Sequence, residues 1–483
     1  MSHHPSAVAR RVIEAYFDFA RATGSDDLLP QFLALLFLKN EHTAPSAGGA
    51  GPRRQLVLSR EHRWELLEHG GKDLAQRLDA MMEASSEANP WLRACVEGVR
   101  FSPLRMGPLP NKNVVLGRLI QQISTVPFLD DRTAPEVCDT LLAHVEASQR
   151  SLSLPPNDVC DMLATLLGPE EGSTVHDPVC GVGECLAACR RYRLRISGDT
   201  VPGRDLVLSG REPSSQLQSV CRLRALFSVR GEPFIALGDV LRESPMAAEG
   251  VPVSYQHVIC CPPIGRRFDP ELFHGHHDSG PAGTFPRTSF ADLAYVYHAL
   301  SVLRPGGTAA ILVSRGPLFR GTGEQEARSA LVRARLVRAV VELPPNLLSY
   351  TSLPVFAVLL RHDVRRGERE GVVFVDASRI HGAAGRKNVL RPEDIERIAQ
   401  LCSVTNEDSA PCRYAGVEEI ASHAWSLNPR TYSTGSRSPS GTPIEILKAE
   451  IAALEASRDD AAMAMDRAAS ALMAVSDASG GSS

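Results

Sequence analysis

Carboxylates and glycines follow three apolar, β-branched runs of this 483-residue sequence, at the points where strands would end. Asp177 opens the turn Asp177-Pro178-Val179-Cys180-Gly181-Val182-Gly183, Glu212 ends the second run, and Asp239 follows the third. In a parallel sheet these three side chains reach one crevice, and the paired glycines let the backbone approach a ligand closely. No Gly-Lys-Ser/Thr phosphate loop is present, so the pattern favours S-adenosyl-L-methionine over NAD or ATP.

A fourth apolar run ends in Cys261-Pro262-Pro263-Ile264. The two prolines fix their φ angles and remove two hydrogen-bond donors, so they project the preceding side chain and carbonyl into the same crevice. Cys261 could act as a nucleophile, but the nearest base in the sequence is His257, more than roughly 10 Å away along one strand at about 3.3 Å per residue. A structural cysteine is therefore favoured.

Alternating strand and helix patterns indicate the scaffold that positions these residues. We predict an all-α domain over residues 1–150, a doubly wound α/β domain over 151–365 and an extension over 366–435 with a strand at 372–375. The predicted helices of the α/β domain include 215–227 and 291–303. Its seven predicted strands lie at 174–180, 206–212, 234–240, 257–263, 307–314, 337–344 and 355–362.

A separate terminal helix is predicted over 441–475. Its apolar residues alternate in steps of three and four, as in a coiled coil; they are Ile444, Leu447, Ile451, Leu454, Ala461, Met465, Ala468 and Leu472. The pattern fits docking to another subunit and folding back on the same chain equally well, so both alternatives stay open.

Composition excludes several classes of protein. The content of 43% hydrophobic and 22% charged residues, without a long apolar run or a signal-peptide pattern, predicts a globular, cytoplasmic protein. The net charge of −4 belongs to the tail after Gly441, which holds seven acidic and three basic residues. Charge therefore neither supports nor excludes DNA binding. The eleven cysteines include no Cys-x-x-Cys pair, and the cluster His274-Gly275-His276-His277-Asp278 lacks further ligands, so no metal site is predicted.

The order of these motifs resembles that of the modification (M) subunit of type I restriction-modification systems, a family of N6-adenine DNA methyltransferases. The resemblance covers nearly the whole chain, from Leu36-Phe37-Leu38-Lys39 to Ser426-Leu427-Asn428-Pro429-Arg430-Thr431-Tyr432. It implies a seven-stranded class I, Rossmann-like methyltransferase sheet and DNA as a partner. It also implies a specificity-type subunit that reads the DNA, bound through the N-terminal domain or the coiled-coil-like terminal helix.

The resemblance assigns a part of S-adenosyl-L-methionine to each cofactor residue. Asp177, Gly181 and Gly183 would surround the methionine, Glu212 would hold the ribose and Asp239 would contact the adenine. Pro156 is what remains of the family's Phe-Tyr-Thr-Pro cofactor segment, which reads Ser153-Leu154-Pro155-Pro156 here. Glu184 replaces a small residue and adds a carboxylate near that of the cofactor unless it points to solvent.

The family's catalytic loop reads Asn-Pro-Pro-Phe or Asp/Asn-Pro-Pro-Tyr, and it corresponds to Cys261, Pro262, Pro263 and Ile264. There the first side-chain oxygen and the first proline carbonyl accept hydrogen bonds from the target amine, while the ring stacks on the flipped adenine. A thiol is a weak acceptor, and the missing ring removes stacking of about 1–3 kcal/mol per base. Ordinary adenine methylation is therefore expected to be slow or absent.

Three functions remain open on this sequence. The first is a DNA adenine-N6 methyltransferase subunit of a restriction-modification or defence system that tolerates Cys261 and Ile264. The second is a catalytically inactive scaffold or DNA-binding homologue of that family. The third is a methyltransferase that acts on a non-DNA acceptor, because the changes lie where the acceptor is recognised.

Overall fold

The computed structural model describes most of the chain up to residue 432. The described residues are 6–25, 28–43, 56–57, 63–104, 111–130, 133–148, 154–197, 206–228, 233–242, 254–269, 290–321, 323–349, 351–362, 370–385, 387–403 and 411–432. They belong to the first of two units into which the chain divides, Met1–Ser433. The predicted terminal helix 441–475 and the histidine cluster 274–278 lie outside the described residues. None of the described helices is long and apolar enough to cross a membrane.

Helices account for the N-terminal region, as its amphipathic spacing predicts. They are α1 (Ala7–Thr23), α2 (Leu29–His42), α3 (Trp64–Glu68), α4 (Leu74–Ala88), α5 (Pro90–Val96), α6 (Lys112–Ser124) and α7 (Thr133–Ser148). The first shows how local chemistry sets the ends: the Ser6 hydroxyl accepts the Ala9 N–H at 3.2 Å, and Gly24 closes the helix with φ at 65°. Apolar side chains of these helices form one core.

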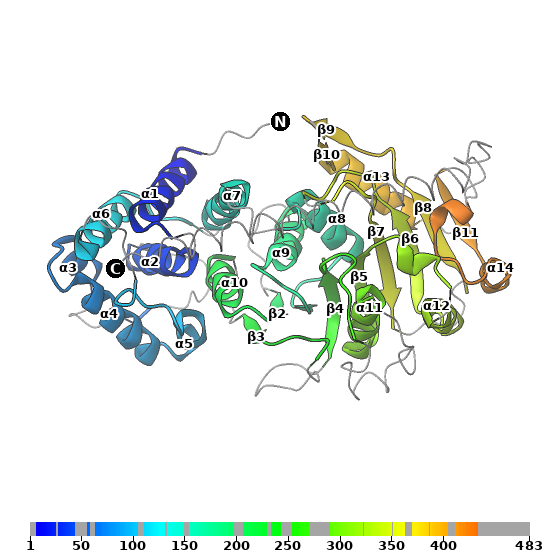
Figure 1. Ribbon diagram of the computed structural model, residues 1–483, viewed down its shortest axis with the longest axis horizontal. Helices are drawn as coiled ribbons and strands as arrows, with labels where there is room; N and C mark the ends of the chain where they lie inside the picture. The colour runs from blue at the N-terminus through cyan, green and yellow to red at the C-terminus, as the bar shows by residue number, and fades with distance from the viewer. Residues whose placement is uncertain are drawn as a thin grey trace, which may run out of the picture. The chain divides into compact units, whose positions relative to one another are not determined.

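Nine strands form a single sheet with the order β11-β8-β6-β7-β5-β4-β1-β2-β3 (Figure 1). They are β1 (Thr174–Asp177), β2 (Val207–Glu212), β3 (Phe234–Leu237), β4 (Tyr255–Cys260), β5 (Leu303–Val313), β6 (Val337–Glu342), β7 (Phe356–Arg361), β8 (Val372–Asp376) and β11 (Cys412–Ala415). The five strands from β3 to β5 are parallel, whereas β7 is antiparallel to β5 and β6. The strand order reverses between β1 and β4, where doubly wound folds bind ligands.

The seven predicted strands all form, but seven is too low a count for the sheet. The strand predicted in the extension, now β8, pairs with β6, and β11 pairs with β8 in turn. The sequence does not predict β11, because its four residues, Cys-Arg-Tyr-Ala, include no β-branched residue and form no apolar run. The first strand ends at Asp177 rather than at residue 180, because the following residues turn through Gly181 and Gly183 at positive φ.

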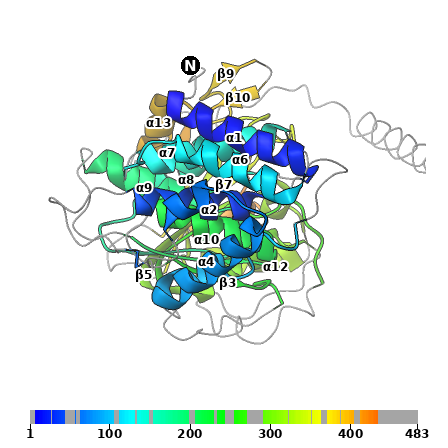
Figure 2. The ribbon, with the colours of Figure 1, turned by 90° about the vertical axis from the view of Figure 1, so that its left-hand side faces the viewer.

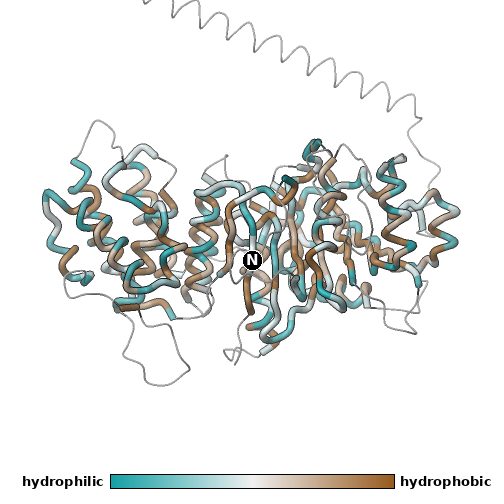
Figure 3. Tube along the Cα trace, turned by 90° about the horizontal axis from the view of Figure 1, so that it is seen from below, coloured by the Kyte–Doolittle hydropathy of each residue, from teal (hydrophilic) through white to brown (hydrophobic). Residues whose placement is uncertain are grey.

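Helices cover both faces of the sheet, and apolar residues concentrate along the strands (Figure 3). On one face lie α8 (Asn157–Leu167), α9 (Glu184–Ile196) and α13 (Pro392–Ser403), and on the other α11 (Asp292–Ser301) and α12 (Gly323–Arg333). Short elements complete the described residues: η3 (Gly316–Leu318), β9 (Gly382–Ala384), β10 (Lys387–Val389), α14 (Val417–Ser422) and η4 (Pro429–Thr431).

Helix α10 (Ser215–Ser228) joins the sheet to the N-terminal helices (Figures 1 and 2). The Phe227 ring packs edge-on against Phe37 of α2 at 5.5 Å, and the Arg222 guanidinium donates to the Ala94 carbonyl at 2.6 Å. Val182 lies in the turn from Asp177 to Gly183, which is called the glycine turn below. Its side chain belongs to the same core as the N-terminal helices. The glycine turn is therefore held from both the sheet and the helical bundle.

Candidate cofactor and acceptor site

The register of the sheet brings the three predicted carboxylates to one edge. Asp177 pairs with Gly210 on the neighbouring strand, and Glu212 pairs with Leu237 on the next. Asp239 follows two residues after Leu237, beyond the end of β3. Because all three strands run in the same direction, their carboxyl ends meet at the crevice where the strand order reverses.

Both carboxylate oxygens of Glu212 accept backbone hydrogen bonds, and one of these bonds comes from the glycine turn. One oxygen accepts the Gly181 N–H at 3.1 Å and the other accepts the Ser214 N–H at 2.9 Å. Gly181 and Gly183 have φ of 53° and 86°, which favours glycine. The close packing continues at Gly210, where a Cβ would lie 2.9 Å from the Cys180 side chain. Glu212 thus fixes the turn as well as lying where a ribose acceptor is predicted.

Burial sets the protonation of these carboxyls. It raises the pKa of Asp177 to about 8, even though the Val179 N–H donates to this carboxylate at 3.0 Å. Burial also raises the pKa of Glu212, and its two backbone donors oppose that change. A cation bound in the crevice would stabilise the ionised form of both groups.

Asp239 is connected to the loop that follows β4. Its carboxylate accepts the Leu241 N–H at 3.0 Å and lies 3.2 Å from the Arg266 guanidinium. Arg266 also donates to the Tyr295 hydroxyl at 3.4 Å. Arg266 therefore connects Asp239, the predicted adenine contact, with the segment just after the predicted catalytic loop Cys261-Pro262-Pro263-Ile264, which is called the acceptor loop below.

The side chain of Cys261 faces other sulfurs. Its Sγ, with those of Cys160 on α8 and Cys185 on α9, forms a trio within 4.8 Å of one another. Ile264 packs against the apolar core on the same face of the sheet. His257 bonds Thr308 at 2.9 Å, and burial lowers its pKa to about 4. The prediction of a structural rather than nucleophilic Cys261 fits these contacts.

Pro156 lies at the start of α8, the helix that carries Cys160. It is the N-cap residue, and its carbonyl accepts the Cys160 N–H at 3.1 Å. Pro156 and the trio are therefore linked through the first turn of α8.

Glu184 is buried, so it does not point to solvent, and its carboxylate is held by a side chain of α10. Its carboxylate bonds the buried Arg224 guanidinium of α10 at 2.8 Å. Arg224 also pairs with Asp139 of α7 at 2.5 Å and donates to the Val182 carbonyl in the glycine turn at 3.2 Å. A second arginine, Arg191, pairs with Asp139 at 2.6 Å. Through the bond from Arg224 to Val182, this charge network stabilises the glycine turn.

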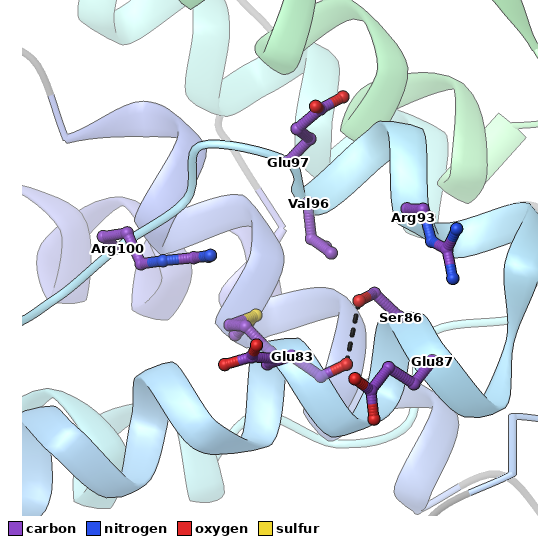
Figure 4. A pocket seen from close by; sticks show the side chains of 8 residues that line it. Glu83, Ser86, Glu87, Arg93, Val96, Glu97 and Arg100 are labelled. Atoms are coloured by element: carbon purple, nitrogen blue, oxygen red, sulfur yellow. Dashed lines mark hydrogen bonds between the residues drawn. The ribbon is translucent and has the colours of Figure 1, made fainter.

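A pocket of about 250 Å³ lies elsewhere, between α4 and α5. Figure 4 shows its lining, which mixes acidic and basic side chains and contains none of the predicted residues; it consists of Met82, Glu83, Ser86, Glu87, Arg93, Val96, Glu97 and Arg100. Its three glutamates outnumber its two arginines by one, so the opposite charges largely offset one another and the pocket has no strong preference for an anion or a cation.

Comparison with known proteins agrees with the geometry. A family model described as N-6 DNA Methylase matches residues 140–439. Two curated relatives are the methylase subunits of the type I restriction enzymes MpnII of Mycoplasma pneumoniae and MjaVII of Methanocaldococcus jannaschii. The first is 32% identical over 35% of this chain and 31% of its own length, and the second is 26% identical over 57% and 48%. The chain therefore spans half or less of each of these relatives.

The fold is shared with a solved structure as well. The type I restriction-modification methyltransferase subunit of Streptococcus thermophilus matches with a TM-score of 0.71 and 18% identity. The match covers 88% of this chain and 99% of that subunit. At this identity the likeness concerns the fold, which is that of an α/β methyltransferase.

Proposed function

The chain belongs to the N-6 DNA methylase family, and on that premise we propose that it is an S-adenosyl-L-methionine-dependent DNA adenine-N6 methyltransferase subunit of a restriction-modification or defence system. The observation that carries the proposal is that Asp177, Glu212 and Asp239 stand at the carboxyl ends of three adjacent parallel strands, with Glu212 bonded to the glycine turn. The changed residues of the acceptor loop make its transfer to adenine slow.

The donor set of the crevice fits this cofactor. S-adenosyl-L-methionine carries a sulfonium, an ammonium and ribose hydroxyls, which are complementary to carboxylates. The phosphate groups of NAD or ATP would instead be repelled by three acidic side chains. Asp177 would balance the positive methionine part, Glu212 would hold the ribose and Asp239 the adenine, while Pro156, Gly181 and Gly183 shape the wall. The cofactor supplies the electrophilic methyl group, and these residues bind and orient it.

The affinity for S-adenosyl-L-methionine is expected to rise with pH between pH 6 and 7.5. Burial raises the pKa of Asp177 to about 8, so this carboxyl must lose a proton to balance a cation. Binding then releases a proton, and affinity increases by up to about tenfold per pH unit below the pKa. Calorimetry across this range measures the slope. Asp177→Asn should flatten it, and a flat profile in the wild-type protein would contradict this role for Asp177.

Glu212→Ala is expected to weaken cofactor binding by about 100-fold or more. The substitution removes an acceptor for the Gly181 and Ser214 N–H groups, each bond to a charged group being worth about 1.5–3 kcal/mol. Calorimetry measures the change, with circular dichroism to verify the fold. Glu170→Ala, at an exposed position before β1, is the control. Wild-type affinity in Glu212→Ala would remove Glu212 from the site.

On the acceptor side, the Pro262-Pro263 pair would present the Cys261 carbonyl and the first proline carbonyl to the target amine, and Ile264 would lie where the family stacks a ring. Labelled methyl transfer to unmethylated DNA, with and without a specificity-type subunit, tests the reaction. N6-methyladenine in the product supports it. No label in DNA, despite bound cofactor, would contradict it.

A second candidate is a catalytically inactive scaffold or DNA-binding subunit. It is favoured by the Cys261 thiol, which lies with two other sulfurs and supplies no amide or carboxylate oxygen. In either case we propose that residues 1–150 or the terminal helix 441–475 bind a specificity-type subunit, and that residues 151–365 hold the cofactor with 366–435 as an extension. Pull-down with and without residues 441–475 separates the two binding regions.

A further inference from the structure

The sulfur atoms of three cysteines from separate elements lie close together at the start of the acceptor loop. Cys160 comes from α8, Cys185 from α9, and Cys261 from the residue after β4. Their Sγ atoms all lie within 4.8 Å of one another, and the Cys185 and Cys160 sulfurs are 3.6 Å apart. No other group of three potential ligands with this spacing occurs among the described residues.

The spacing fits a shared metal ion. Two thiolates bound to Zn²⁺ at about 2.3 Å in tetrahedral geometry lie roughly 3.8 Å apart. A disulfide would need the sulfurs to approach to about 2.05 Å. Cys160 and Cys185 are buried, whereas Cys261 is half-buried and open to solvent on one side. The site therefore offers three soft ligands and one position for a further ligand.

The type of ligand decides which class of ion the trio would hold. The Cys185 thiol donates to the Cys160 sulfur at 3.6 Å, so these two side chains already point at one another. A divalent ion would balance two of the three thiolate charges. Soft thiolates select Zn²⁺ over Mg²⁺ or Ca²⁺, which prefer oxygen.

We propose that Cys160, Cys185 and Cys261 form a binding site for one thiophilic divalent cation of the Zn²⁺ class, with the fourth position taken by solvent beside Cys261. The ion would tie the acceptor loop to α8 and α9. It would also explain why the residue at the head of that loop is a thiol whose side chain faces the core face of the sheet. The inference does not depend on methyl transfer.

Titration of the reduced, metal-free full chain with Co²⁺ tests the site, because thiolate-bound Co²⁺ absorbs in the near ultraviolet and visible. We expect one equivalent to bind and Zn²⁺ to displace it. Cys160→Ser should weaken binding by at least about 100-fold, since even the loss of an outer contact costs 10–100-fold. Cys189→Ser, at a buried position of the same helix as Cys185, should leave the signal unchanged.

Three results would overturn the proposal. They are no cobalt–thiolate band at one equivalent, equal affinity in wild type and Cys160→Ser, and fewer than eleven free thiols in the denatured, untreated chain, which would indicate a disulfide. If Cys160→Ser does not fold, Cys261→Ser at the half-buried position gives the same comparison. Because the titration contains no S-adenosyl-L-methionine, failure of the metal site and failure of the proposed function are distinguishable.

Discussion

Arg224→Met is expected to reduce the free energy of unfolding by about 3–5 kcal/mol, the usual cost of removing one partner from a buried ion pair. Arg224 bonds Glu184 at 2.8 Å and Asp139 at 2.5 Å, and all but 2% of its side chain is buried. Burial alone would raise the pKa of Asp139, but Arg224 and Arg191 lower it below its usual range. Methionine keeps an unbranched apolar stem but lacks the guanidinium, so both carboxylates lose this partner.

Urea denaturation followed by circular dichroism measures the loss. The control is Arg335→Met, because the Arg335–Glu370 pair at 2.5 Å is exposed on both sides and worth less than about 1 kcal/mol. Glu184→Gln in the Arg224→Met background should recover part of the stability, since it removes one unpaired buried charge. If Arg224→Met is as mild as Arg335→Met, the network does not brace the glycine turn.

Cys261→Asn combined with Ile264→Phe is expected to increase adenine-N6 methylation of DNA by on the order of 10³- to 10⁵-fold. One preorganised hydrogen bond to the reacting group is worth about 10²–10³ in rate. Stacking of about 1–3 kcal/mol per base contributes roughly a further 5- to 150-fold. Cys261 is half-buried, and the amide would have to turn away from the Cys160 and Cys185 sulfurs to reach the acceptor.

Methyl transfer from labelled S-adenosyl-L-methionine to DNA, with product analysis for N6-methyladenine, measures this gain. Cys261→Ala with Ile264→Leu is the matched control, because it changes both positions without supplying an amide or a ring. Cofactor affinity should stay at the wild-type value in both double variants. No gain in the Asn/Phe variant at unchanged cofactor affinity would show that the acceptor is not adenine in DNA.

The site residues that directly follow strands could be predicted from the sequence. Asp177, Glu212 and Asp239 each follow a short apolar run, and strand direction alone brings such residues to one edge. The glycine turn is equally visible, because positive φ at Gly181 and Gly183 demands glycine. The likeness to known subunits then rests on the order of these local motifs.

Contacts between helices could not be predicted in the same way. The Arg224 pairs join residues 40 and 85 positions apart, and the sulfur trio draws on three elements. Nothing in the local sequence distinguishes Cys160 or Cys185 from the other buried cysteines. The partner of Glu184 could not be predicted for the same reason, since Arg224 on α10 approaches it only in the folded chain.

Calorimetric titration of the wild-type chain with S-adenosyl-L-methionine is the most direct test of the central claim, that the crevice beside the glycine turn is an intact cofactor site. We predict saturable heat with one site per chain at pH 7.5, weakened about 100-fold or more in Glu212→Ala and unchanged in Glu170→Ala. The absence of heat from the folded wild-type chain, at protein concentrations on the order of 100 μM that would reveal even weak binding, would contradict it.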